Sequence, residues 1–229
     1  MSIGLFLDVD DVLTQEPINI QLARLLGVEK DLQETETKFH NNKIDNDEFN
    51  RILIGLFRDK KLTQNFIKDN YSNFRMRIYH DELVRMCDNV HLLSSGPSYF
   101  IDILGQKLSI PQDRILCSKY IFDEQGVIFR CIRPVNSNMK ARFVKQFSSN
   151  FDLTIGVGNN PEQDNPFLSN CDIKILMGEH RDGYIGIRDI GTLINLINIL
   201  KGVGTRNPTP DVDKATYEGA KPKTGYYNK

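Results

Sequence analysis

Three aspartates, Asp8, Asp10 and Asp11, follow directly after the apolar segment 3–7 near the start of the chain. A continuous apolar run is typical of a central strand in a parallel sheet, and open α/β sheets bind ligands beyond the carboxyl ends of their strands. Because Asp8 and Asp10 are two residues apart, one carboxylate could attack an electrophile while the other exchanges a proton with the leaving group. An acidic loop without chemistry is the alternative for this motif alone.

Three further groups that could do chemistry come later, each next to a predicted strand or helix. In chain order they are Ser94 with Ser95 and Gly96, then Lys140, then the loop 158–164 with Asn159 and Asp164. Taken singly, each has an ordinary explanation, because a serine after a strand often caps a turn or helix and a lysine is often solvated. Their order along the chain is what favours a shared site.

These groups and their order resemble the four motifs of the haloacid dehalogenase (HAD) superfamily, and in particular its phosphoserine-phosphatase-like branch. The resemblance covers about residues 1–200. It is closest in the loop Asp8-Val9-Asp10-Asp11, in segment 92–100 and in the hairpin that precedes Lys140. It implies an α/β fold, with a Rossmann-like HAD core whose mainly parallel sheet is flanked by helices, and with an inserted all-helical cap.

The resemblance implies a phosphatase that hydrolyses a phosphomonoester through an aspartyl phosphate. Asp8 would attack phosphorus, and Asp10 would protonate the leaving group and then activate water. Ser94 would donate a hydrogen bond to a phosphoryl oxygen, helped by the next two backbone amides near a helix N-terminus. Lys140 would offset the negative charge of Asp8 and of the phosphoryl group.

A Mg²⁺ site is also implied, with one departure from the family pattern. Family members usually carry an Asp directly after the glycine of the last motif, where this chain has Asn159, whereas Asp164 matches the second Asp. Together with Asp8 and the backbone carbonyl of Asp10, these residues are the implied metal ligands. An amide offers an oxygen without the charge, so weaker metal binding is expected. A catalytically weak HAD-like pseudoenzyme that acts as a binding or regulatory module is therefore the alternative.

The residues that phosphoserine phosphatases use for their substrate are not matched. An acidic residue and a cap arginine bind the ammonium and carboxylate groups there, and these positions fall at Pro17 and near Ile52. Glu16 and Arg51 are each one residue away, and one residue on a helix turns a side chain by about 100°. The expected substrate is therefore a small phosphorylated metabolite other than phosphoserine.

Helical periodicity dominates the segment that follows the nucleophile loop. Apolar residues at the spacing of an amphipathic helix are Phe49, Ile52, Leu53, Leu56 and Phe57. Such a face must be buried, and within this segment it is most simply the cap's own core. We expect residues 15–88 to form the helical cap.

Strands alternate with helices in the rest of the chain. Predicted strands cover 90–93, 115–117, 153–157 and 173–176, with a hairpin over 120–132. This alternation predicts a mainly parallel sheet, so residues 1–14 and 89–201 are expected to form the catalytic core. Residues 202–229 carry Gly and Pro without an apolar period, which favours an extended or disordered tail, with a partner-docking arm as the alternative.

The composition excludes several classes of function. The chain has 229 residues, of which 40% are hydrophobic and 26% charged, and a formal net charge of -1. Without a positive field, neither nucleic acid nor an anionic membrane is an expected partner. The four cysteines form no CxxC pair, which argues against a thiol redox motif or a structural zinc site. No segment is typical of a signal peptide or a membrane span, so a cytoplasmic location is expected, and the residues do not indicate an oligomeric state.

Overall fold

A seven-stranded sheet forms the centre of the computed structural model, which describes residues 1–178 and 180–202. Its strands are β1 (Ile3–Asp8), β2 (Asn89–Pro97), β3 (Ile115–Phe122), β4 (Ile128–Arg133), β5 (Leu153–Gly158), β6 (Ile173–Met177) and β7 (Ile185–Ile187). They lie in the order β4-β3-β2-β1-β5-β6-β7, and every neighbouring pair is parallel except β3 and β4. The predicted α/β fold with a mainly parallel sheet is confirmed.

Helices connect most of the successive strands, whereas β3 leads directly to β4 and β6 to β7. The helices are α1 (Ile18–Leu26), α2 (Glu29–His40), α3 (Asn46–Asp59), α4 (Gln64–Asp69), α5 (His80–Arg85), α6 (Ser98–Lys107), α7 (Ser137–Ser148), α8 (Pro161–Leu168) and α9 (Ile190–Leu200), which follows β7. Side-chain caps set where several of them begin: Asp45 accepts the Glu48 amide at the start of α3, and Asp189 accepts the Thr192 amide at the start of α9. No helix in the described part of the chain is long and apolar enough to cross a membrane.

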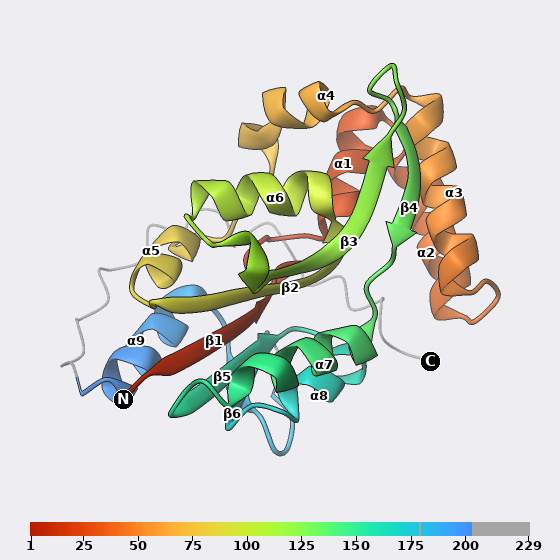
Figure 1. Ribbon diagram of the computed structural model, residues 1–229. Coiled ribbons are helices and arrows are strands. Elements are labelled where there is room, and N and C mark those ends of the chain that lie inside the picture. Colours follow the sequence, from red (N-terminus) through yellow and green to blue (C-terminus); the bar gives the residue numbers. More distant parts are fainter. Residues whose placement is uncertain (179, 203–229) are drawn as a thin grey trace, which may run out of the picture.

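Helices cover both faces of the sheet. Figure 1 shows α6 on one side of the strands and α7 with α8 on the other. The side chains of β1 alternate between two cores: Leu5 and Leu7 lie in the core beneath α6 and α9, whereas Phe6 lies in the core beneath α7 and α8. This explains why segment 3–7 is apolar without interruption, since both of its faces are buried.

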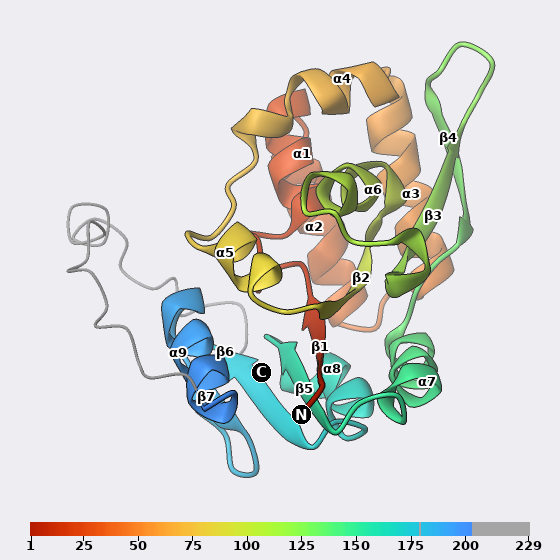
Figure 2. The same ribbon diagram turned by 60° about the vertical axis from the view of Figure 1, so that its left-hand side comes forward.

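Helices α1 to α4 lie beyond the carboxyl end of β1 (Figure 2). Two backbone hydrogen bonds join the chain entering this region to the chain leaving it: the Gln15 amide donates to Arg75 O at 2.9 Å and the Arg77 amide to Leu13 O at 2.8 Å. Helix α5 comes after this crossing and packs against α9. We propose that the cap covers about residues 16–74, and that α5 belongs to the core although it lies within the range 15–88 assigned from the sequence.

The strand register brings the ends of three strands together. Asp8 at the end of β1 is paired with Leu93 of β2, and Leu7 with Val157 of β5. Because the three strands are parallel, the segments that follow them emerge at one edge of the sheet. The predicted tail 202–229 lies outside the described residues except for Gly202.

Candidate active site

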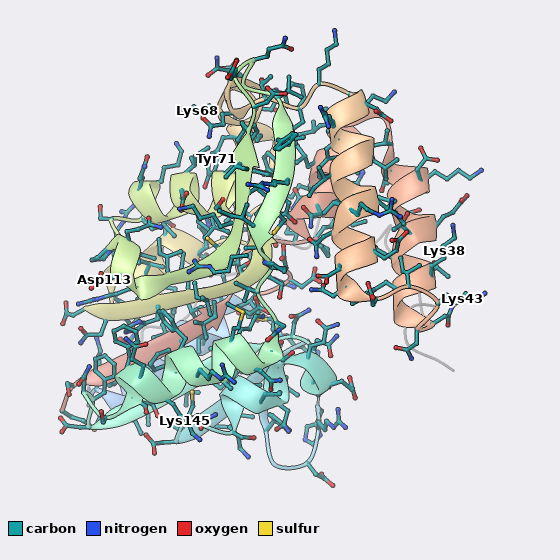
Figure 3. The ribbon with its side chains drawn as sticks, turned by 45° about the vertical axis from the view of Figure 1, so that its right-hand side comes forward. Lys38, Lys43, Lys68, Tyr71, Asp113 and Lys145 are labelled. Atoms are coloured by element: carbon teal, nitrogen blue, oxygen red, sulfur yellow. The ribbon has the colours of Figure 1, made fainter. Side chains whose placement is uncertain are left out.

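A buried ammonium group joins two of the predicted site residues. The Lys140 Nζ donates to Asp8 Oδ2 at 2.8 Å and to Asp164 Oδ1 at 3.2 Å, and its side chain is 6% exposed. Lys140 lies in the first turn of α7, which begins where the Asn136 side chain accepts the Met139 amide. On the same helix Lys145 points outward (Figure 3). Lys140 of α7 therefore lies in the candidate site, whereas Lys145 of the same helix lies at the surface.

The charges of this cluster depend on one another. Burial raises the pKa of Asp8 well above its usual range, the Lys140 charge opposes this, and the charges of Asp164 and Asp10 add to it. Burial alone would lower the pKa of Lys140, but the charges of Asp8 and Asp164 outweigh burial and hold it above its ordinary value. Lys140 therefore stays protonated and favours the ionised form of Asp8.

Asp164 organises the loop after β5. Its Oδ2 accepts the amides of Asn159 and Asn160, both at 3.0 Å, while its Oδ1 accepts Lys140. Gly158 makes room for this carboxylate, because a Cβ at that position would lie 2.6 Å from Asp164 Oδ2. Asp164 does not line the cavity described below. These contacts favour a role for Asp164 in positioning Lys140 and the loop over its predicted role as a metal ligand.

Asp10 links the strand end to the cap. Its Oδ1 accepts the Ile18 amide at 2.7 Å, so it caps α1, whose preceding residue Pro17 offers no side-chain cap. Its Oδ2 accepts no hydrogen bond from a described residue. Gly96 leaves room beside this oxygen, because a Cβ at position 96 would lie 3.2 Å from it. Burial raises the pKa of Asp10, against the opposing effects of the Ile18 amide and of Lys140. A raised pKa suits a group that must carry a proton to a leaving group.

The serine segment at the end of β2 differs from the expectation. Ser95 and Gly96 line the cavity, whereas Ser94 is buried and its Oγ accepts the Gly96 amide at 2.8 Å. The Ser95 carbonyl accepts the Ser118 hydroxyl at 2.7 Å, which holds the segment in place. Of the two serines, Ser95 lines the cavity, whereas the resemblance assigned the phosphoryl contact to Ser94.

A cavity of about 770 Å³ lies between the sheet edge and helices α1 to α3. Predicted site residues in its wall are Asp8, Asp10, Ser95, Gly96, Lys140 and Asn159. Side chains that the sequence did not single out include Asn19, Arg24, Glu29, Gln33, Glu36, Phe39, Asn46, Asn50, Ser118 and Tyr120. A cleft with convergent polar groups beyond the ends of parallel strands is the usual form of a small-molecule site.

Glu16 and Arg51 are each one residue away from a position that binds substrate in phosphoserine phosphatases, and their surroundings differ. Glu16 lines the cavity, but it is paired with Arg24 at 2.7 Å and with Arg75 at 3.1 Å. Arg51 lies outside the cavity and pairs with Glu48 on its own helix. The pair of charges that would bind phosphoserine is therefore not assembled by these two residues.

The cavity residues fit a Mg²⁺ ion held partly by the substrate. No group of three or more His, Cys, Asp or Glu side chains among the described residues is arranged to hold a metal ion. Asp8, Asp10 and Asn159 nevertheless face the cavity together, and Mg²⁺ is commonly held by one or two carboxylates, waters and substrate phosphate. The Asn159 Nδ2 donates to Asp11 Oδ2 at 3.3 Å, which leaves Oδ1 as the atom for a metal.

No family model matches the sequence, and no curated protein matches it. Solved structures do. A probable phosphoserine phosphatase from Vibrio cholerae is similar with a TM-score of 0.71 at 15% identity, over 90% of this chain and 68% of that chain. A phospho-aspartyl intermediate analogue of phosphoserine phosphatase has a TM-score of 0.67 at 18% identity, over 89% of this chain and 100% of that one. A HAD family hydrolase from Salmonella enterica serovar Typhi has a TM-score of 0.69 at 14% identity, over 82% of this chain and 68% of that one. The chain therefore has the fold of the HAD superfamily, in the form found in phosphoserine phosphatases.

Proposed function

We propose that this protein is a phosphatase that hydrolyses a small phosphorylated metabolite with the help of Mg²⁺. The observation that carries the proposal is the buried Lys140 ammonium bound to Asp8 at a strand end, in one cavity with Asp10 and the segment Ser95–Gly96. Phosphoryl transfer needs a nucleophile, a proton source and positive charge around the equatorial oxygens. These residues supply all three, and the fold shared with the phospho-aspartyl intermediate analogue supports the same chemistry.

In the first step an Asp8 carboxylate oxygen attacks phosphorus, and the bond from phosphorus to the ester oxygen breaks. Asp10 gives its proton to that oxygen, so that the alcohol leaves. Its Oδ2 suits this task because Oδ1 is already engaged by the Ile18 amide. Lys140 and Ser95 bind the phosphoryl oxygens, and a bound Mg²⁺ would add positive charge beside them.

In the second step water attacks phosphorus of the aspartyl phosphate. Asp10, now ionised, takes a proton from this water, and the bond from phosphorus to Asp8 breaks to release inorganic phosphate. The cap covers the site, and exclusion of bulk water strengthens the electrostatic interactions of Lys140 and Asp8. The Asp10 hydrogen bond to α1 joins this proton carrier to the cap, so cap closure and the position of Asp10 are mechanically connected.

The test is hydrolysis of p-nitrophenyl phosphate with Mg²⁺ and with a chelator, by the wild type, Asp8→Asn and the exposed control Asp59→Asn. We expect Asp8→Asn to lose turnover by a factor of about 10³ or more, since covalent catalysis needs the carboxylate. The control should retain it. Asp10→Asn should accumulate a phosphorylated protein that intact-mass spectrometry detects. Near wild-type turnover by Asp8→Asn would refute the mechanism.

A binding or regulatory module without catalysis is the second candidate. Asn159 favours it, because the amide replaces a carboxylate at the implied metal position and donates to Asp11 instead. This candidate predicts that purified protein binds a phosphorylated ligand but does not hydrolyse p-nitrophenyl phosphate or a panel of phosphorylated metabolites at any Mg²⁺ concentration. Hydrolysis that depends on Asp8 would exclude it.

A further inference from the structure

One face of α2 lines the cavity with polar side chains. Glu29, Gln33, Glu36 and Phe39 are spaced as neighbours on one side of a helix, and all of them line the cavity. The basic Lys38 of the same helix is exposed and points away from the core (Figure 3). In α2, therefore, the carboxylates of Glu29 and Glu36 face the cavity, whereas Lys38 faces solvent.

Glu36 differs from Glu16 and Glu29, the other cap carboxylates that line the cavity, because it has no basic partner among the described side chains. Among the described residues that line the cavity, six are acidic and two, Arg24 and Lys140, are basic. Arg24 is bound by Glu16 and Glu29, and Lys140 is bound at the strand ends. Glu36 has no hydrogen bond or ion pair with a described residue. Burial, together with the smaller effects of the Asp10 and Asp11 charges, raises the pKa of Glu36 to about 7.

The surroundings of Glu36 also suit a cation. Phe39, three residues after Glu36 on α2, lines the same cavity together with Phe49. Their ring centroids are 5.1 Å apart, and aromatic faces attract cations. An unpaired carboxylate and aromatic rings would both gain from a ligand that carries positive charge.

We propose that Glu36 binds a positively charged amine on the leaving group, so that the substrates are phosphate esters of amino alcohols. This rests on the proposed phosphatase function and names its substrate class. A substrate carboxylate would find both basic residues of the described cavity wall already engaged, so amino alcohols fit the cavity better than phosphorylated amino acids. The phosphate would lie at Lys140 and Asp8 while the amine lies toward α2.

Two pairs of esters with the same shape test this proposal. O-phosphoethanolamine is compared with propyl phosphate, and O-phosphocholine with neohexyl phosphate, so that only the charge differs within a pair. In the pair of esters that the wild type hydrolyses better, kcat/KM for the charged ester should exceed kcat/KM for the neutral ester by about tenfold or more. A preference of this size is typical of a close pair of opposite charges. In Glu36→Gln this ratio should fall toward one. Glu34→Gln removes an exposed charge from the same helix outside the cavity, and it should leave the ratio unchanged.

An unchanged ratio in Glu36→Gln overturns the proposal, while hydrolysis of the neutral esters would still support the phosphatase function. A Glu36→Gln effect that disappears at high Mg²⁺ and is equal for charged and neutral esters would assign Glu36 to metal binding instead, and also overturns it. If no ester is hydrolysed, the proposed function fails. Isothermal titration with O-phosphocholine then decides: weaker binding by Glu36→Gln than by the wild type supports the cation site, and equal binding refutes it.

Discussion

His91, buried in β2, makes the stability of this protein depend on pH. Its Nδ1 and Nε2 have no hydrogen-bond partner in the described part of the chain, and the residue is 1% exposed. Its ring stacks on Phe6 with centroids 4.6 Å apart and also contacts Phe143, Phe147 and Phe151. Burial in this apolar setting, together with the smaller effect of the Arg114 charge, lowers the pKa of His91 to about 4.

The sign and size of the effect follow from linkage. The unfolded chain takes up a proton on His91 as the pH falls below about 6.5, whereas the folded protein does so only near pH 4. Between these values protons bind preferentially to the unfolded state, so stability is lost as the pH falls. A full shift of this size corresponds to about 3 kcal/mol, and roughly 2 kcal/mol of it should already be lost at about pH 5.

His91→Phe keeps an aromatic ring but removes the titrating group. We expect the free energy of unfolding of this variant to fall less than that of the wild type between about pH 7 and pH 5, by roughly 2 kcal/mol. Urea unfolding followed by circular dichroism at several pH values measures this difference. His180→Gln, at an exposed histidine, is the control and should follow the wild type. Parallel pH profiles for the wild type and His91→Phe would refute the reasoning.

Three substitutions test the site. Gly158→Ala forces a Cβ against Asp164, so it should lower stability by about 1–3 kcal/mol in urea unfolding, and an unchanged stability would show that Asp164 can move freely. Asn159→Asp should tighten Mg²⁺ binding in isothermal titration, and equal affinities would mean that residue 159 is not a ligand. Lys140→Met leaves Asp8 and Asp164 buried without their cation, so unfolding should require about 3–5 kcal/mol less; a loss near zero would contradict the charge balance described for this cluster.

Several elements could be predicted because their signals are local. The apolar run of β1 and the amphipathic spacing of α3 each reflect burial that the element's own residues reveal. Helix α2 was not distinguished within the cap, because its cavity face is polar and therefore has the pattern of a solvent-exposed helix. Glu36 was missed for the same reason. A stripe of polar residues at helical spacing, Glu29, Gln33 and Glu36, was the available signal.

The sequence by itself predicted the α/β sheet, and it predicted phosphoryl transfer because carboxylates directly after an apolar strand, with Lys140 and Asp164 in a fixed order, resemble the HAD motifs. Only the tertiary structure decided which atoms face the ligand. A shift of one residue along a strand reverses the side chain's direction, so Ser95 and not Ser94 lines the cavity. Both oxygens of Asp164 are engaged by Lys140 and the loop amides. These directions depend on packing between segments far apart in the chain, which residue spacing does not encode.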